Sequence, residues 1–498
     1  MKNYLCVSVF IGGFLLFALA GCAAGPPQAG PKEERAGSAS GRVTFVLSGE
    51  TDGFIVPCGC TFKQFGGLPR RGTCLQLFRQ AEGAGPGSAG VPPASASAGE
   101  TPALPGAGSV VYVDAGGNVH RATAYDAIKL EYILRGLAKM QVAAVNLGPG
   151  EILLGAEKLR ELAQLGAPLL STNVTAGEAQ PWKDHISLTA GGLKLALVGV
   201  CAQAVKAGPG LVVNDPEQAL RESVPGLAQQ HDAVILLVYG SEDACAKLCS
   251  GFPEITTVLA TGVPQPVAPR LLNERIVFAA AAQKGKFLAR AELACLSGKW
   301  ELASGNIVEL DEGFADQKEQ MQNLADYKAR LRQARLEPAA TGEAPALLAS
   351  VPREYRYAGS QTCAECHPED NEKHKASQHA TAVEKLRERN FEYDPYCLKC
   401  HTTGYGGPGG FVRVDLTPAL SGVGCENCHG PSLGHLEDPH VRTPSNAKSA
   451  CPNCHDAENS PKFEYTAYYK KVEHGQVKAT RWKRAPVVKK EGPASGTN

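Results

Sequence analysis

The stretch Gly424-Cys425-Glu426-Asn427-Cys428-His429-Gly430 holds two cysteines separated by two residues, with a histidine directly after the second. The same pattern, Cys-x-x-Cys-His, occurs four times in the C-terminal part of the chain. The four copies are Cys363–His367, Cys397–His401, Cys425–His429 and Cys451–His455. With 17 Cys and 12 His among 498 residues, chance would give this pattern roughly 0.01 times. The copies therefore indicate one shared chemistry.

Each copy is the attachment signature of a c-type haem, in which two thiols form thioethers with the porphyrin and the histidine ligates the iron. The pattern predicts four covalent haems in a multihaem cytochrome c region. The predicted attachment cysteines are Cys363, Cys366, Cys397, Cys400, Cys425, Cys428, Cys451 and Cys454, and the predicted iron ligands are His367, His401, His429 and His455. Paired zinc knuckles are the alternative, but they would not place a histidine after every second cysteine.

A haem iron has a second axial position, which His or Met usually fills. The chain has only Met1, Met140 and Met321, so the distal ligands within this region must be histidines, or a position is left open. The remaining histidines of the region are His374, His379, His435, His440 and His474. Because four haems need at most four of them, at least one is spare. Two His ligands lower the haem potential relative to Met/His, which suits electron transfer.

The segment from Tyr357 to Gly475 resembles the cytochrome c-554 family of tetrahaem cytochromes. The similar features are Ser377-Gln378-His379-Ala380, Gly424–Pro431 followed by His435, and Phe463, Tyr468 and His474 after the last motif. The resemblance implies that His379, His435 and His474 are distal ligands, with His374 as a further candidate axial ligand and His440 without a counterpart. In this family one haem can lack a distal side chain, and the sequence leaves that open.

The N-terminus predicts export. Lys2 precedes an apolar run from Leu5 to Ala20, which ends in Leu19-Ala20-Gly21-Cys22. This pattern is typical of a secretory signal peptide, and its ending resembles the lipobox of bacterial lipoproteins, which implies lipidation of Cys22. An ordinary signal peptide with an incidental cysteine is the alternative. We therefore expect an extracytoplasmic protein, lipid-anchored to a bacterial membrane at the outer membrane or a periplasmic face.

Fifty Lys and Arg balance fifty Asp and Glu, so nothing in the net charge suggests a nucleic-acid partner. Shifts in composition predict the domain organisation. It comprises a signal peptide (1–22), a flexible tether (23–41), an α/β domain (42–315) with a low-complexity insertion (81–108), a helix and linker (316–350), a mostly helical, loop-rich haem domain (351–477) and a basic tail (478–498).

Apolar strand-like runs alternate with helical patterns between residues 42 and 310, which predicts an α/β sheet with helices on both faces. The expected strands are Val43–Leu47, Val110–Asp114, Val142–Leu147, Leu193–Val200, Ala233–Tyr239 and Arg275–Ala281. The expected helices are Tyr125–Met140, Ala156–Leu165, Pro216–Gln230, Glu242–Ser250 and the joining helix Asp316–Leu336.

This domain resembles the calcineurin-like metallophosphoesterase domain of 5′-nucleotidases. The similar segments include Val113-Asp114-Ala115-Gly116, Ser171-Thr172-Asn173-Val174 and Gln283-Lys284-Gly285-Lys286. The family's metal ligands are replaced: Gly117 stands for an Asp, Gly148-Pro149-Gly150-Glu151 for Gly-Asn-His-Glu, Tyr239 for a His and Gly262-Val263-Pro264-Gln265 for Gly-His-x-His. The resemblance implies a retained fold that has lost its two-metal phosphoesterase chemistry.

Thiols occur where the family would hold its metals. The cysteines are Cys58, Cys60, Cys74, Cys201, Cys245 and Cys249, and several follow predicted strands. Because ligand sites gather beyond the carboxyl ends of strands, we expect these thiols to converge. Disulfides, a redox-active dithiol and a thiolate metal site all remain open. The segment 57–71, with Arg70 and Arg71, is predicted to be a loop that offers two cations to an anionic substrate.

These features favour electron transfer through four haems, with redox proteins (other cytochromes or membrane oxidoreductases) as partners. The first alternative is a multihaem oxidoreductase that acts on a small nitrogen or sulfur compound at an open haem or a cysteine site. The second is a metal-dependent phosphohydrolase fused to a cytochrome. An open iron would bind CO, and a hydrolase would release phosphate from a nucleotide with added Mn²⁺.

Overall fold

The computed structural model describes residues 40–57, 64–83, 109–177, 180–342, 352–444 and 447–475. The signal peptide, Cys22, the basic tail, and nearly all of the tether and the low-complexity insertion lie outside these ranges, as do Cys58 and Cys60. None of the described helices combines the length and the apolar character needed to cross a membrane.

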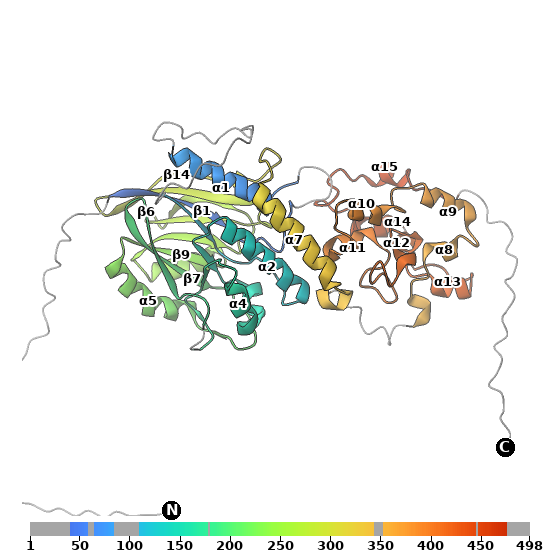
Figure 1. Ribbon diagram of the computed structural model, residues 1–498, viewed down its shortest axis with the longest axis horizontal. Coiled ribbons are helices and arrows are strands. Elements are labelled where there is room, and N and C mark those ends of the chain that lie inside the picture. The colour runs from blue at the N-terminus through green and yellow to red at the C-terminus, as the bar shows by residue number, and fades with distance from the viewer. Residues whose placement is uncertain are drawn as a thin grey trace, which may run out of the picture. The chain divides into compact units, whose positions relative to one another are not determined.

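The strands of the α/β region divide between two six-stranded sheets (Figure 1). The first has the order β14 (Lys299–Glu309), β13 (Phe287–Leu296), β1 (Gly41–Ser48), β2 (Val110–Asp114), β3 (Ala144–Asn146) and β4 (Leu169–Leu170). The second has the order β11 (Val267–Leu272), β12 (Ile276–Ala280), β10 (Ile255–Thr261), β9 (Ala233–Tyr239), β7 (Leu193–Cys201) and β6 (His185–Ala190). A short antiparallel pair, β5 (Val174–Thr175) and β8 (Val212–Val213), lies apart from both.

Four layers result, because the two sheets pack face to face. Successive residues of β1 alternate between the two sides, so Phe45 and Leu47 enter the core between the sheets and Val46 the core beneath the helices. Strand β9 is buried along its whole length because it is covered on both faces. The expected α/β class is confirmed, but each sheet has helices on one face only and the other sheet on the opposite face.

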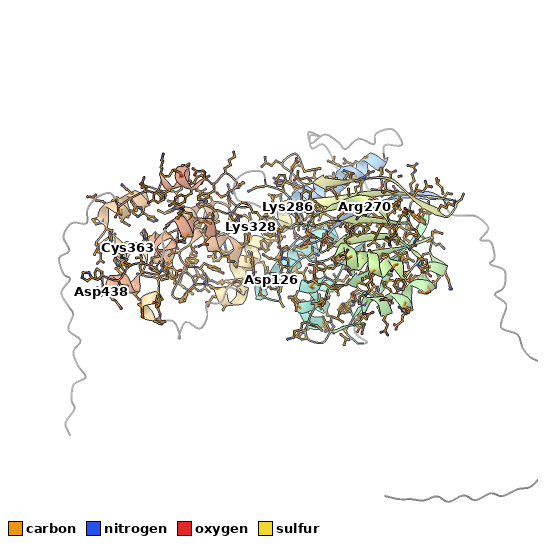
Figure 2. The ribbon with its side chains drawn as sticks, turned by 180° about the vertical axis from the view of Figure 1, so that it is seen from behind. Asp126, Arg270, Lys286, Lys328, Cys363 and Asp438 are labelled. Atoms are coloured by element: carbon orange, nitrogen blue, oxygen red, sulfur yellow. The ribbon has the colours of Figure 1, made fainter. Side chains whose placement is uncertain are left out.

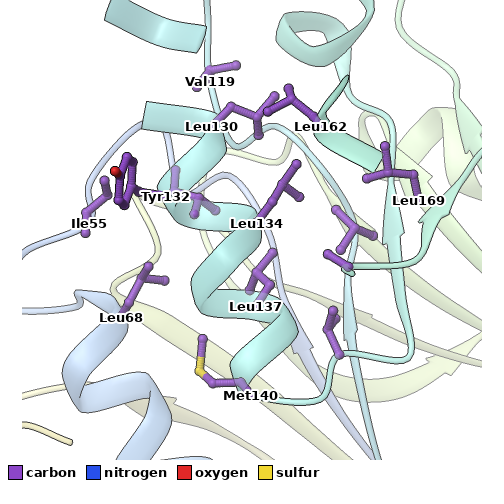
Figure 3. Packing of buried hydrophobic residues seen from close by; sticks show 14 of the residues in the cluster. Ile55, Leu68, Val119, Leu130, Tyr132, Leu134, Leu137, Met140, Leu162 and Leu169 are labelled. Atoms are coloured by element: carbon purple, nitrogen blue, oxygen red, sulfur yellow. The ribbon is translucent and has the colours of Figure 1, made fainter. Parts of the chain in front are cut away.

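Helices cover the outer face of each sheet. Those of the first sheet are α1 (Leu68–Gly83), α2 (Ala124–Lys139), α3 (Pro149–Leu153), α4 (Gly155–Ala163) and α7 (Lys318–Ala334), and those of the second are α5 (Pro216–Gln230) and α6 (Glu242–Ser250). The side chain of Thr123 caps α2 by accepting from the backbone N–H of Asp126. The helix then buries Leu130, Leu134 and Leu137 at helical spacing (Figure 3).

The haem region consists of short helices and turns. They are α8 (Ser360–Cys363), α9 (Pro368–Lys375), α10 (Ala382–Glu388), α11 (Pro395–His401), α12 (Cys425–His429), α13 (Leu433–Glu437), α14 (Ala447–Ala450) and α15 (Tyr465–Tyr469). Its apolar cluster is small, with Leu386, Leu398, Phe411 and Leu420 as its buried members. A region with so little apolar core of its own fits a domain that is built around large bound groups.

Candidate haem centres

One turn of helix carries each attachment motif. Helices α11 and α12 hold the second and third motifs whole, and the backbone N–H groups of His367 and His455 donate to the carbonyls of Cys363 and Cys451 at 2.9 Å. Gly430, with φ +84°, ends α12 directly after its histidine. The turn brings both thiols and the imidazole of a motif to one place, as covalent attachment and ligation of a single haem require.

Three pairs of imidazoles from distant parts of the chain face each other. The ring centres are 6.4 Å apart for His367 and His435, 6.1 Å for His379 and His455, and 5.8 Å for His429 and His474. Metal–nitrogen bonds of about 2 Å on both faces of one iron would place two imidazole centres roughly 6 Å apart. The spacing of the three pairs therefore fits bis-histidine axial ligation.

Hydrogen bonds to the other ring nitrogen orient several of these imidazoles. Nδ1 of His435 lies 2.7 Å from the Val441 carbonyl, Nδ1 of His474 lies 2.8 Å from the Val472 carbonyl, and Nδ1 of His455 lies 3.0 Å from the Ser460 hydroxyl. A carbonyl can only accept, so His435 and His474 carry their proton on Nδ1, which leaves Nε2 for a metal. These partners were not apparent from the sequence, because they depend on the turns that follow each histidine.

Burial favours the neutral form of three of the paired rings. Desolvation lowers the pKa of His379, His429 and His455, and the facing imidazole of His455 or His474 lowers the pKa of His379 or His429 further. A neutral imidazole is the form that ligates a metal. The electrostatics of these sites thus agree with their geometry.

The remaining attachment histidine, His401 of the second motif, differs from the other three. Nδ1 of His401 lies 2.7 Å from the Ala382 carbonyl, and in the described ranges no ring contact joins His401 to a second histidine. Nε2 of His374 lies 2.7 Å from the Val423 carbonyl. The candidate axial role of His374 stays a prediction. His440 is exposed, and its backbone N–H donates to Asp438 at 3.0 Å.

Cysteines of different motifs lie close together. The thiols of Cys363 and Cys425 are near enough to perturb each other's pKa, and so are the thiols of Cys400 and Cys454. Cys428 and Cys451 are near enough to interact electrostatically. These sulfur atoms stand for the thioether sulfurs of a haem-loaded chain. The first attachment site is thus beside the third, the second beside the fourth, and the third beside the fourth.

The expected convergence of thiols in the α/β region is wrong for the described cysteines. Cys74 and Cys201 lie in the core beneath the helices of the first sheet, whereas Cys245 and Cys249 face the outer side of the second sheet from α6. Burial raises the pKa of all four thiols to about 12, and none of them is in a disulfide. Within the described ranges, no group of three or more His, Cys, Asp or Glu is arranged to hold a metal ion.

The expected cationic loop is also wrong from residue 68 onward, where α1 begins. The guanidinium of Arg71 is fully buried; it donates to the Thr51 hydroxyl at 3.1 Å and lies 4.0 Å from the Asp114 carboxylate. Arg70 is buried too and donates to the Gln64 carbonyl. Both cations thus stabilise loops of the α/β region from inside and do not face solvent.

Tyr239 fills the space at the carboxyl ends of the strands, where the resemblance would place metal ligands. A Cβ atom at Gly117 would lie 2.5 Å from Cε2 of Tyr239, and one at Gly262 would lie 3.1 Å from Cε1. The Tyr239 ring thus lies between Gly117, which replaces a carboxylate of the family, and Gly262, which precedes the position of the family's histidines. Gly117 thus lacks room for the carboxylate that would bind a metal at that position.

The substitution Gly117→Asp tests this packing. Because Gly117 has φ +74° and faces the Tyr239 ring, we expect a loss of about 2–4 kcal/mol in the free energy of unfolding. Gly192→Asp is the matched control, since Gly192 has φ +80° with nothing within 4 Å of its Cβ position. Thermal unfolding of the full chain followed by circular dichroism compares the two variants. Equal losses in both would show that Tyr239 does not fill the site.

Comparison with known proteins supports two different relationships. Residues 362–430 match the family model described as cytochrome c554 and c-prime. Cytochrome c-554 of Nitrosomonas europaea is 31% identical over 97 residues, which are 16% of this chain and 41% of that protein. The chain thus spans less than half of the curated relative.

Similar solved structures cover the α/β region. A 5′-nucleotidase precursor from Thermus thermophilus has a TM-score of 0.47 at 16% identity, covering 59% of each chain. The NAD nucleotidase of Haemophilus influenzae has 0.47 at 12% identity, covering 64% of each chain, and a calcineurin-like phosphoesterase from Bacillus subtilis has 0.43 at 15% identity, covering 59% of this chain and 98% of that one. The haem region is therefore similar to the cytochrome c554 family, and the α/β region to 5′-nucleotidases and calcineurin-like phosphoesterases.

Proposed function

We propose that this chain transfers electrons through four covalently attached c-type haems. The observation that carries the proposal is the set of three facing imidazole pairs, each of which joins one attachment histidine to a histidine elsewhere in the sequence. Bound haem supplies one-electron chemistry. The chain's own contribution is to attach, orient and partly enclose each group.

The axial ligands follow from these pairs. His367 with His435, His455 with His379, and His429 with His474 would each hold one haem iron. We propose that His401 would hold the fourth iron without a second imidazole. This assignment uses the distal histidines that the cytochrome c-554 resemblance implies and leaves out His374.

The contacts between thiols support an order for the four attachment sites. The first lies beside the third, the third beside the fourth, and the fourth beside the second. Electrons would thus enter at the first site, where Cys366 is exposed, and leave at the second site, which carries His401. A soluble or membrane-bound redox protein at the exposed end is the expected partner.

The open position favours a second candidate, in which the chain is an oxidoreductase that acts on a small nitrogen or sulfur compound at the iron of His401. A phosphohydrolase is disfavoured because the Tyr239 ring fills the space between Gly117 and Gly262.

We further propose that the chain is exported and anchored through a lipid on Cys22, because haem attachment to Cys-x-x-Cys-His and the N-terminal pattern suit one extracytoplasmic compartment.

Spectroscopy of the holoprotein tests the ligation. We expect EPR to show three low-spin haems and one high-spin haem, and optical titration to show one CO bound per chain. The reason is that, among the described residues, His401 is the attachment histidine without a partner imidazole. Four low-spin haems without CO binding would refute the open position and leave a pure carrier. Two or more high-spin haems would refute the pairing of the histidines. Phosphate release from a nucleotide with added Mn²⁺ would support the alternative that the chain is a metal-dependent phosphohydrolase.

A further inference from the structure

A buried carboxylate joins the second attachment helix to the α/β region. Asp394 directly precedes α11 and is 6% exposed. Its Oδ1 accepts from the backbone N–H of Tyr396 at 3.0 Å, which caps the helix, and also from the hydroxyl of Tyr125. Its Oδ2 accepts from the hydroxyl of Tyr327 at 3.1 Å. The two tyrosines come from α2 and α7.

Both tyrosines are fixed as neutral donors. Tyr125 and Tyr327 are 6% and 3% exposed, and burial, together with the charge of Asp394, raises the pKa of each hydroxyl well above its usual range. An ionised carboxylate in such a place is costly unless donors satisfy it. The hydroxyls of Tyr125 and Tyr327 therefore stabilise the charge of Asp394 by donating hydrogen bonds to its carboxylate.

Further contacts hold the same surfaces together. Lys129 of α2 lies 4.1 Å above the Tyr125 ring, and the rings of Phe54 and Tyr396 meet edge to face at 5.3 Å. Lys286, which follows β12, donates to Glu458 at 2.8 Å, and Lys328 of α7 donates to the Arg389 carbonyl at 2.9 Å. Figure 2 labels the side chains of both lysines. The carboxylate of Asp394 thus sits in a packed interface whose groups have fixed partners.

We propose that Tyr125 and Tyr327 are positioning residues that set the reduction potential of the haem bound at Cys397, Cys400 and His401. Asp394 lies three residues before Cys397, at the start of the turn that carries the whole motif. A negative charge close to an iron stabilises the ferric over the ferrous state, and donors to that charge weaken the effect. The α/β region would thereby tune the one haem for which we propose an open iron, so the inference rests on the proposed function.

Two kinds of variant should shift this potential in opposite directions. In the double variant Tyr125→Phe and Tyr327→Phe the carboxylate loses two donors, so the potential of this haem should fall. Asp394→Asn keeps an oxygen that can cap α11 but removes the charge, so the potential should rise. Tyr132→Phe is the control, because Tyr132 packs on Tyr327 edge to face at 5.7 Å through its ring; it should leave the potential unchanged.

Spectroelectrochemical titration of the full-length holoprotein measures the four potentials, with the high-spin signal marking the haem of interest. Opposite shifts confined to that haem would support the proposal. Shifts of the same sign in both variants, as simple loosening of the interface would cause, would overturn it, and so would no shift. Circular dichroism verifies that each variant is folded. If the wild type has no high-spin haem, the open iron is refuted, but opposite shifts of one of the four potentials would still support the role of the tyrosines, and their absence would still overturn it.

Discussion

Replacing His435 with Ala is expected to raise the number of CO molecules bound per chain from one to two. His435 faces His367 at 6.4 Å between ring centres, and its Nδ1 is held by the Val441 carbonyl at 2.7 Å. Without this imidazole the iron that we propose for His367 would lose its second ligand. A low-spin haem should become high-spin, because histidine on both faces keeps an iron six-coordinate. EPR and CO titration of the holoprotein measure both changes.

His374→Ala and His440→Ala are the matched controls for this prediction. His374 bonds to the Val423 carbonyl, and His440 is exposed, so neither substitution should alter the spin state of any iron. An increase in CO binding in the His374 variant, together with no change in the His435 variant, would reverse the axial assignment. Haem staining on a denaturing gel shows whether all four groups remain attached.

Local signals in the sequence predicted several elements with correct ends. Strands β2 and β9 and helices α5 and α6 coincide with the expected ranges. Asp215 before Pro216 and Ser241 before Glu242 mark helix starts, because their side chains cap the first turn. The same signal, Asp394 before Pro395, marks the start of α11, so the capping role of Asp394 was accessible from the sequence alone.

Information that depends on distant contacts was not accessible from the sequence. The segment 57–71 was expected to be a loop, but α1 begins at Leu68, and Arg71 of this helix points inward to Asp114. The position of Cys245 and Cys249 depends on which face of which sheet α6 covers, and the strand pattern did not reveal a second sheet. Likewise, no periodicity links His367 to His435, because the facing rings are brought together only by the fold of the haem region.

Glu151→Gln is expected to make the protein more stable than the wild type above neutral pH. Glu151 is 1% exposed, its Oε1 accepts from the backbone N–H of Asn118 at 2.7 Å, and Oε2 has no hydrogen-bond partner in the part of the chain that the structure describes. Burial, with a contribution from Asp114, raises the pKa of this carboxyl from 4.5 to about 7. The protonated form is thus the one that the folded protein favours, and Gln has the same shape and an oxygen for the bond to Asn118.

The direction of the pH dependence follows from proton linkage. Between about pH 4.5 and 7 the folded protein holds the proton on Glu151 and the unfolded chain has lost it. The free energy of unfolding of the wild type therefore falls as pH rises through this window. Above the window the buried charge on Glu151 destabilises the folded protein to its full extent. A pKa shift from 4.5 to about 7 corresponds to about 3 kcal/mol.

The difference between Glu151→Gln and wild type should accordingly be near zero at pH 4.5 and reach about 3 kcal/mol in favour of the variant at pH 8. Denaturant unfolding of the full chain, followed by circular dichroism at a series of pH values, measures it. Glu301→Gln is the control, because Glu301 is exposed on β14 and should give no such trend. A variant that is less stable than the wild type at pH 8 would mean that the charged carboxylate has a partner that stabilises it, such as a bound cation beside Tyr239.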